Sequence, residues 1–493
     1  MRRTGSPAAR AAAPPGPGIA PAPGPLPRAP FGVADELSCY YDGPATPANI
    51  HVELRFPGGI DGQALRLAVS TALAAHPRAM ARRAGAGWWR HRREWEQPPR
   101  PDVDPVAVTT WANQEELGRV RERFLMFAPP VDCSPPLRIL LAAGPGEDRL
   151  IINAHHAALD GISCLELLRT VSRRYRAGVP ARAEPVPAGP ASAEPSPAAS
   201  ARPGRWGPAG SAPPAGSSRT ARPRLPGALP RLAARIMPDH HDADPGGDRP
   251  GYGFRLLALP VPAPPRTGQG PHATVNDLLI TALVAAIGRW NAGHGAPGAR
   301  IRITMPVNAR APGQDRVAGN LSRLAVVTAR PPAAGRDLTE LLARVAAQTR
   351  RAKEHAGPQV DPVSHALAAL WCPAAVKRLA LRMALRTAGP LLCDTCLATN
   401  LGIVADPPRF GQLAATGVWV TGPAQMPRGF SVAAITLGGQ LHLGLRYSRA
   451  LLSDRAAADF AGAYTAALAE VTQDAAADLA GLPADVPGAG AGR

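Results

Sequence analysis

Residues 149–161 read RLIINAHHAALDG and join a short apolar run to two adjacent histidines and an Asp-Gly pair. The apolar run follows a Gly-Pro-Gly turn at residues 144–146, as expected of a buried strand. Because side chains alternate across a strand, we expect His155 and His156 to point to opposite faces. The two imidazoles should therefore have different surroundings.

A helix is expected directly after Gly161. Apolar residues recur at helical spacing over residues 162–175, and the basic turn that follows leads to Gly178, a typical C-terminal stop. The segment therefore predicts a strand, a sharp turn and a helix, with the histidines where the strand ends.

This HHxxxDG pattern resembles the signature of the thioester-dependent acyltransferase superfamily, which includes peptide-synthetase condensation domains, chloramphenicol acetyltransferase and bacterial wax ester synthase/diacylglycerol acyltransferases. Further segments resemble the superfamily in order along the chain: residues 60–65, 75–78, 131–138, 273–279, 306–310, 319–322, 400–402 and 441–445. The resemblance implies an α/β fold, with two chloramphenicol-acetyltransferase-like sandwich lobes in a V-shaped pseudo-dimer and a tunnel between them.

The chain also departs from both branches that it resembles. Wax synthases usually carry Pro-Leu-Trp where this chain has Pro136, Leu137 and Arg138. Condensation domains match residues 274–277 less closely. The sequence is therefore identified as a stand-alone member that lies between the branches.

Proline and glycine contribute 58 and 50 of the 493 residues, so the folded mass is smaller than the length suggests. Residues 1–30 and 476–493 are expected to be disordered tails, the first without the apolar region of a signal peptide. Residues 179–250 are predicted to be a low-complexity linker outside both lobes. An N-terminal acyltransferase lobe is expected at residues 31–178 and a C-terminal one at 251–475.

The formal net charge of +18 arises almost wholly from arginine. A GC-rich genome favours arginine codons and is one explanation. The other is attraction to an anionic partner, such as the phosphates of coenzyme A or an acidic carrier protein. Aromatic residues make up 4% of the chain and no basic-aromatic module is visible, so nucleic acid is not an expected partner.

Cys393 and Cys396 form a lone CxxC without a second pair, so no metal site is predicted, and the scattered cysteines fit a cytoplasmic protein. The pair His240-His241 resembles a metal ligand set but lies in the predicted linker. No uninterrupted apolar run reaches the length of about 18 residues that suggests a transmembrane helix. Residues 376–386 predict a core helix with a solvated basic face, although an interfacial helix with peripheral membrane contact fits the same pattern.

Acyl transfer from a thioester requires a base for the acceptor's proton and stabilisation of the oxyanion that forms. An imidazole suits the proton step because its ordinary pKa lies near neutral pH. The resemblance implies that His156 is the general base and that His155 supports the fold. It also implies that Asp160 is structural and pairs with an arginine to hold the loop. Gly161 is expected to supply backbone freedom and an N–H group near the oxyanion.

The second half of the chain is expected to supply substrate contacts. The candidates are Asn276, Asp277, Asn308, Asn320, Ser322 and Arg428. Asn276 and Asp277 equally suit capping of a helix over residues 278–290. Arg428 suits either a donor phosphate or an ion pair with a carboxylate.

The favoured hypothesis is a monomeric enzyme that moves an acyl group to a small-molecule or lipid alcohol or amine. The donor would be acyl-CoA or a carrier protein with a phosphopantetheine-linked acyl group, and no metal or redox cofactor would be needed. One alternative is a non-catalytic condensation-like module that docks a carrier protein. Another is a lipid-surface binding protein built around residues 376–386.

Overall fold

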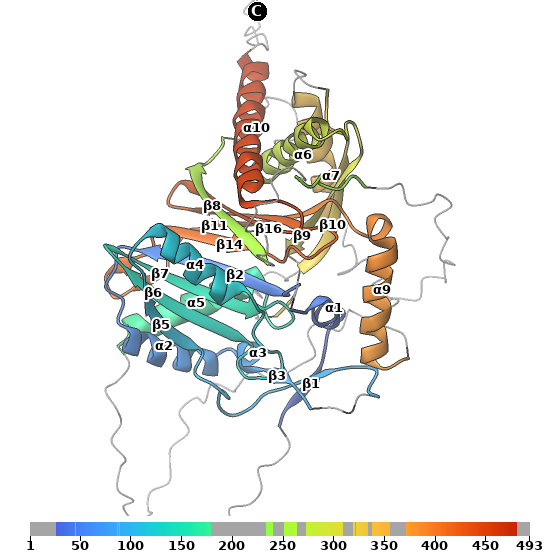
Figure 1. Cartoon of the computed structure of the whole chain (residues 1–493). Helices are drawn as coiled ribbons and strands as arrows, with labels where there is room; N and C mark the ends of the chain where they lie inside the picture. The colour runs from blue at the N-terminus through green and yellow to red at the C-terminus, as the bar shows by residue number, and fades with distance from the viewer. Residues whose placement is uncertain are drawn as a thin grey trace, which may run out of the picture.

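The computed structural model describes residues 26–44, 46–85, 87, 89–178, 233–239, 251–263, 273–308, 319–320, 322–333, 338–354 and 371–480. These residues form a mixed α/β structure with two lobes, each built on its own sheet (Figure 1). The expectation of a two-lobed α/β fold is confirmed. The tunnel between the lobes stays a prediction.

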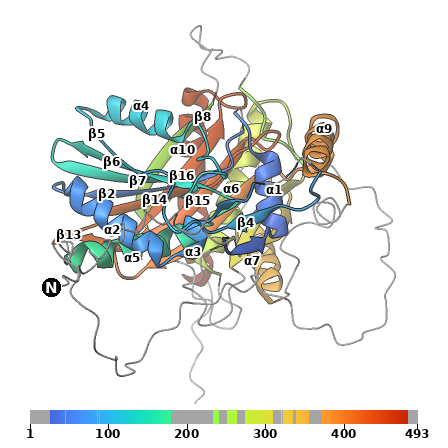
Figure 2. The ribbon, with the colours of Figure 1, turned by 90° about the horizontal axis from the view of Figure 1, so that it is seen from below.

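The N-terminal lobe is a five-stranded sheet with helices on both faces. Its strands follow the order β14 (Gly417–Thr421), β2 (Asn49–Phe56), β7 (Glu147–His155), β6 (Leu137–Gly144) and β5 (Val106–Thr110). One face is covered by α2 (Gly62–Ala74) and α5 (Gly161–Arg176), and the other by α4 (Gln114–Leu125) (Figure 2).

Strand β7 is apolar on both faces because both faces are covered. Leu150 and Ile152 belong to the main core beneath α2 and α5. Ile151 instead joins a smaller cluster with Leu117 of α4. The alternation and the strand predicted from residues 149–154 are thereby confirmed, as is the helix that follows.

The C-terminal lobe is a six-stranded sheet with three helices on one face. Its strands follow the order β10 (Ser322–Ala329), β9 (Ile301–Asn308), β11 (Cys396–Val404), β15 (Phe430–Leu437), β16 (Gln440–Ser448) and β8 (Tyr252–Pro260). The helices are α6 (Val275–Gly293), α7 (Thr339–Glu354) and α10 (Asp454–Ala480). Helix α6 is apolar on most sides because it is buried among α7, α10 and the sheet.

The two lobes exchange structure. Strand β14 comes from the C-terminal half but pairs antiparallel with β2 of the N-terminal sheet, from Gly417 opposite Arg55 to Thr421 opposite His51. The hairpin of β12 (Arg409–Phe410) and β13 (Leu413–Ala414) directly precedes β14 in the chain. Division of the chain into two consecutive halves did not anticipate this exchange.

A second contact between the halves lies beside a small sheet of β1 (Arg28–Pro30), β4 (Glu94–Glu96) and β3 (Arg82–Arg83). The short helix α3 (Pro77–Met80) precedes β3. Helix α9 (Ala374–Leu392) of the C-terminal half packs on α1 (Val33–Tyr41) of the N-terminal half. Leu37, Tyr40 and Leu381 are buried in this contact.

The predicted extents of the disordered tails and of the linker need correction. Residues 28–30 form β1, and α10 continues to Ala480. Within the predicted linker, Ile236 is buried in the C-terminal core and Asp239 accepts a hydrogen bond from the Ser453 N–H at 3.0 Å. A short apolar stretch inside a proline-rich segment can fill a groove that composition alone does not reveal. The rest of the predicted linker, with His240-His241, lies outside the described residues.

The prediction for residues 376–386 is correct in part. Leu381 is buried on α1, and Arg382 and Arg386 are exposed, as expected of a core helix with a solvated basic face. Lys377 is instead buried, with its ammonium group donating to the His91 carbonyl at 2.9 Å, and Val376, Leu379 and Met383 are exposed. None of the described helices is long and apolar enough to cross a membrane.

Candidate active site

The turn between β7 and α5, residues 155–161, is called the histidine turn. Its backbone is closed by a hydrogen bond of 2.9 Å from the Ala158 N–H to the His155 carbonyl. Asp160 is the N-cap of α5, and its Oδ1 accepts from the Ser163 N–H at 2.8 Å. A capping carboxylate fixes where the helix begins, so it also fixes the turn before it.

His155 accepts one hydrogen bond through its ring, and its other ring nitrogen is buried near a carboxylate without a hydrogen bond to a described residue. Its Nδ1 accepts from the Ala157 N–H at 3.0 Å, and its Nε2 lies 3.7 Å from Oδ2 of Asp42. The side chain is 1% exposed. This geometry suits a residue that stabilises the turn.

His156 is held by its backbone and leaves its ring less constrained. Its N–H donates to the Ala48 carbonyl at 2.8 Å, and its carbonyl accepts from Nδ2 of Asn320 at 3.3 Å. The ring is partly exposed, and its buried Nδ1 makes no hydrogen bond to any residue that the structure describes. Burial lowers the imidazole pKa below its ordinary 6.5, so the ring is neutral near pH 7 and can accept a proton.

A segment of the C-terminal half docks on the histidine turn. The Ser163 hydroxyl donates to the Gly319 carbonyl at 2.9 Å, and the Gly319 N–H lies 2.9 Å from the same hydroxyl oxygen. Beside it, the Ser322 hydroxyl lies 3.5 Å from Oδ2 of Asp160. Two of the predicted substrate-binding residues, Asn320 and Ser322, are thus brought to the turn that carries the histidines.

Asn276 and Asp277 have other partners. Asp277 is buried and accepts from the Thr274 N–H at 2.8 Å and from the Thr349 hydroxyl. The amide of Asn276 donates to the sulfur of Met305 at 3.1 Å. The helix cap is Thr274, with Asp277 completing a capping box, so the expectation that Asn276 caps this helix is corrected.

Asn308 and Arg428 lie at different places in the C-terminal lobe. Asn308 is at the exposed end of β9, in register with Ser322 and therefore beside the segment that reaches the turn. The charge of Arg428 acts on the Cys396 thiol, whose pKa burial raises to about 12 while the guanidinium opposes that rise. No described contact joins Arg428 to His156.

Gly161 has a different role from the one expected. Its backbone does not adopt a positive φ, so the expectation of special backbone freedom is wrong. A Cβ atom at this position would lie 2.8 Å from Cδ2 of Leu401 and 3.8 Å from Cγ1 of Val420. The glycine is required because the C-terminal half packs directly against the start of α5.

Arg78 supports the histidine turn and is not among the site residues that the sequence predicted. Its guanidinium donates to the carbonyls of Ala157 and Ala158 at 3.1 and 3.3 Å and pairs with Asp35. It therefore holds the histidine turn through backbone oxygens. The sequence feature that could have indicated Arg78 is its position directly after the His-Pro pair at residues 76–77. An arginine partner for Asp160 stays a prediction.

Arg446 was also missed. It is fully buried, and its Nη1 donates to the Asn49 carbonyl at 3.2 Å while the guanidinium lies 4.6 Å from the ring centre of Tyr252. Its Nε and Nη2 make no hydrogen bond to any described residue. Burial lowers its pKa to about 10. The available signal was an arginine within residues 441–447, where most positions are apolar.

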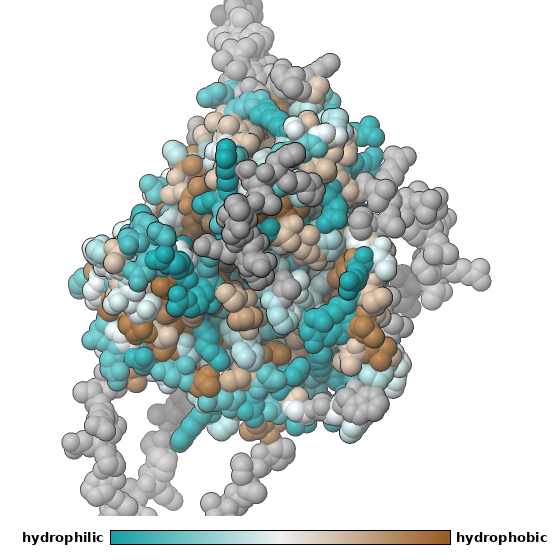
Figure 3. Space-filling view, viewed as in Figure 1, coloured by the Kyte–Doolittle hydropathy of each residue, from teal (hydrophilic) through white to brown (hydrophobic). Residues whose placement is uncertain are grey.

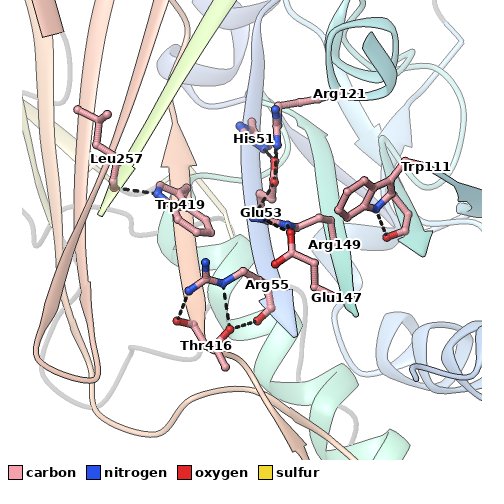
Figure 4. A network of polar contacts seen from close by, with 11 residues as sticks. His51, Glu53, Arg55, Trp111, Arg121, Glu147, Arg149, Leu257, Thr416 and Trp419 are labelled. Carbon is pink, nitrogen blue, oxygen red and sulfur yellow. Dashed lines mark hydrogen bonds and ion pairs between the residues drawn. The ribbon is translucent and has the colours of Figure 1, made fainter. Parts of the chain in front are cut away.

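A buried network of charges, which we call the Glu53 network, crosses β2 between α4 and β14 (Figure 4). Glu53 accepts from Arg121 at 2.6 and 2.8 Å, lies 3.2 Å from Nε2 of His51 and is 3.5 Å from Arg149. Nδ1 of His51 lies 3.3 Å from the Thr421 hydroxyl, which joins the network to the exchanged strand. Burial alone would favour the neutral acid, but Arg121 and His51 hold the pKa of Glu53 far below its usual range.

Comparison with solved structures identifies the class of fold. The wax ester synthase/diacylglycerol acyltransferase from Marinobacter aquaeolei VT8 is 12% identical, with a TM-score of 0.53 over 91% of this chain and 100% of that chain. The starter condensation domain of rhizomide synthetase, solved with C8-CoA, is 13% identical, with a TM-score of 0.56 over 91% and 95%. The SgcC5 protein from Streptomyces globisporus is 16% identical, with a TM-score of 0.52 over 90% and 99%. The chain has the fold of the CoA-dependent acyltransferase (condensation-like) superfamily, as its resemblance implied.

Within that fold, the chain belongs to the family of an uncharacterised mycobacterial protein. It is 32% identical over 431 residues to the uncharacterised protein Rv2305 of Mycobacterium tuberculosis H37Rv, across 84% of this chain and 93% of that protein. The uncharacterised protein MT2362 of the CDC 1551 strain matches equally well. No family model matches the chain.

Proposed function

We propose that this protein transfers an acyl group from a thioester to a hydroxyl or amine acceptor, with His156 as the general base. The observation that carries the proposal is the state of the His156 ring. It is kept neutral by burial, one of its nitrogens has no partner among the described residues, and it lies where Asn320 of the C-terminal half meets the histidine turn.

In the proposed reaction, His156 removes the proton from the acceptor as the acceptor's oxygen or nitrogen attacks the thioester carbonyl carbon. The carbonyl becomes an oxyanion, for which the Gly161 N–H at the start of α5 is the candidate donor. The carbon–sulfur bond then breaks, and the departing sulfur takes the proton from His156. The products are an ester or amide and a free thiol, and the imidazole returns to its neutral form.

The surrounding residues act by positioning. Arg78 holds the carbonyls of Ala157 and Ala158, and Asp160 fixes the start of α5. His155 closes the turn through the Ala157 N–H. A base that must reach a proton within hydrogen-bond distance benefits from a turn that is held at several points.

The donor and acceptor classes are supported by what related folds bind. The rhizomide synthetase domain was solved with C8-CoA, which supports a CoA thioester donor. The SgcC5 protein was solved with an aryl ethanediol, which supports a hydroxyl acceptor. Other similar structures belong to the nonribosomal peptide synthetase FmoA3, which supports an acyl group linked to a carrier protein as the alternative donor.

The test is release of free thiol by the purified full-length chain. Acyl-CoA of several chain lengths and acyl carrier protein are incubated with pools of alcohols and amines, and the products are identified by mass spectrometry. We expect acceptor-dependent turnover by the wild type and by the control His294→Ala, whose ring lies at the end of α6, and strongly reduced turnover by His156→Ala.

Two outcomes would contradict the proposal. Full turnover in a folded His156→Ala variant would remove His156 as the base. An absence of turnover with every donor, together with tight binding of a carrier protein, would support the non-catalytic docking module instead.

A further inference from the structure

A hollow of about 550 Å³ lies between α9 and the segment that connects β3 to β4, apart from the histidine turn. Its lining is dominated by positive charge. The arginines that line it are Arg83, Arg90, Arg92, Arg93, Arg378 and Arg382, and Asp132 is the one acidic residue among the described residues of the lining. We call this feature the arginine hollow.

Three of these arginines have acidic partners. Arg83 pairs with Asp132 at 2.9 Å, and Arg90 pairs with Glu94 at the same distance. Arg93 lies 4.0 Å from Glu36, which is too long for a hydrogen bond. Their charge is therefore only partly neutralised.

The other three arginines make no ion pair with an acidic side chain that the structure describes, although the charge of the Asp42 carboxylate acts on Arg378. Arg378 and Arg382 donate to the Asp42 carbonyl at 2.6 and 3.2 Å, and a carbonyl carries no net charge. Arg92 is exposed and makes no ion pair with a described residue. The hollow thus keeps an excess of positive charge, which attracts anions.

Two buried donors lack partners here. Nη1 of Arg93 and Nε of Arg378 are buried and make no hydrogen bond to any described residue. Burial and the nearby charges of Arg382 and Arg93 lower the pKa of Arg378. Like charges at close range are unfavourable by themselves, and an anion bound in the hollow would relieve their repulsion.

We propose that the arginine hollow binds a phosphate ester. Guanidinium groups recognise phosphate oxygens through paired N–H donors, and the volume lies within the range of about 300–1,000 Å³ typical of small-molecule sites. A carboxylate would satisfy fewer donors than a phosphate, which presents more oxygens at a higher charge. This phosphate site goes beyond the proposed acyl transfer and does not depend on it.

The phosphate can come from a nucleotide thioester such as coenzyme A or from a lipid headgroup. A nucleotide is supported by Asp42, whose carbonyl accepts from Arg378 while its carboxylate lies 3.7 Å from Nε2 of His155. A lipid is supported by the exposed Val376, Leu379 and Met383 on the adjoining face of α9, where Figure 3 shows hydrophobic residues beside hydrophilic ones. Both sources share the chemistry that the hollow recognises.

The experiment measures direct binding by calorimetry and requires no turnover, so its failure is distinguishable from failure of the acyl-transfer proposal. The probes are coenzyme A, adenosine 3′,5′-bisphosphate, and vesicles of phosphatidylglycerol or of phosphatidylcholine. The double variant Arg92→Gln with Arg382→Gln removes two exposed arginines of the hollow. The matched control, Arg119→Gln with Arg344→Gln, removes two exposed arginines from α4 and α7 and the same net charge.

We expect a phosphate-bearing probe to bind the wild type and the control, and to bind the hollow variant at least about tenfold more weakly. If coenzyme A and adenosine 3′,5′-bisphosphate bind but neither kind of vesicle does, the hollow is assigned to a nucleotide. If phosphatidylglycerol vesicles bind and phosphatidylcholine vesicles do not, it is assigned to a lipid headgroup. A second variant, Ala375→Glu, leaves the arginines intact and places a carboxylate at an exposed lining position. It should abolish binding.

The proposal is overturned if no probe binds the wild type at millimolar concentration. It is also overturned if the hollow and control variants weaken binding equally, since binding would then follow net charge alone. Unchanged binding by folded Ala375→Glu would contradict it as well.

Discussion

The histidine turn and the Glu53 network each bury an imidazole, and burial lowers the pKa of both His156 and His51. They differ in their partners. Both ring nitrogens of His51 face a protein group, Glu53 on one side and Thr421 on the other. His156 has a buried nitrogen without a partner among the described residues. Burial alone therefore does not distinguish the two histidines, whereas the partners of their ring nitrogens do.

Replacement of the two adjacent histidines of the histidine turn should separate their roles most sharply. We expect His156→Ala to lower the rate of acyl transfer by about 10²–10⁴, the usual effect of losing a general base, with little change in unfolding free energy. His155→Ala should mainly lower stability because its ring closes the turn. Single-turnover kinetics and urea unfolding of both variants provide the check. Equal effects of the two variants on rate and stability would erase the distinction.

Glu53→Gln should produce the largest loss of stability. Removal of the carboxylate charge leaves Arg121 buried without its anion, which typically costs about 3–5 kcal/mol, while Arg149 keeps its ion pair with Glu147. Urea unfolding at neutral pH measures it. A loss below about 1 kcal/mol would show that the network does not stabilise the lobe.

The stability that Glu53 contributes should also depend on pH. Its pKa is lower in the folded protein than its ordinary 4.5, so the contribution is present above 4.5 and is lost as the pH falls toward the folded pKa. The difference in stability between wild type and Glu53→Gln should therefore shrink only below that value. A difference that disappears near neutral pH would contradict the assignment.

Gly161→Ala tests the contact between the halves at the histidine turn. The added methyl group would lie 2.8 Å from Leu401, and overpacking of this kind usually costs about 1–3 kcal/mol. Gly118→Ala is the matched control, because nothing lies within 4 Å of the corresponding position on α4. It should be neutral or slightly stabilising. Thermal unfolding of the two variants gives the comparison, and equal behaviour would contradict the tight packing.

Asp160 should have the smallest effect. Asp160→Ala removes the cap of α5 and should lower stability by about 0.5–2 kcal/mol, whereas Asp160→Asn keeps a capping oxygen. Neither should move the kinetic pKa by as much as loss of His156 does. A folded Asp160→Asn variant that has lost the kinetic pKa would make Asp160 part of the proton transfer.

The sequence predicted the parts of the site that are local. The strand, the turn and α5 follow from apolar spacing over residues 149–176. The resemblance singled out Asn320 and Ser322 as candidates but did not predict their contacts with the histidine turn. Glu53 and Arg446 could not be found in this way. Their importance comes from which distant strands pair, and local spacing does not encode that pairing.

The orientation of α9 shows the same limit. Interleaved arginines and apolar residues predicted a solvated basic face, and Arg382 is exposed, but packing on α1 also placed Lys377 inside and Leu379 outside. An amphipathic pattern indicates two faces without indicating which one meets a partner. Only the position of α1, from the other end of the chain, decides it.

The most direct test of the central claim is the pH dependence of kcat/KM for the wild type with an alcohol acceptor, which does not itself titrate in this range. If His156 is the base, kcat/KM rises with pH through a single ionisation below 6.5 and is constant above it, because burial lowers the pKa of this imidazole and only its neutral form accepts the proton. A profile without an ionisation in the range where the protein stays folded, or with its inflection above 6.5, would contradict the claim.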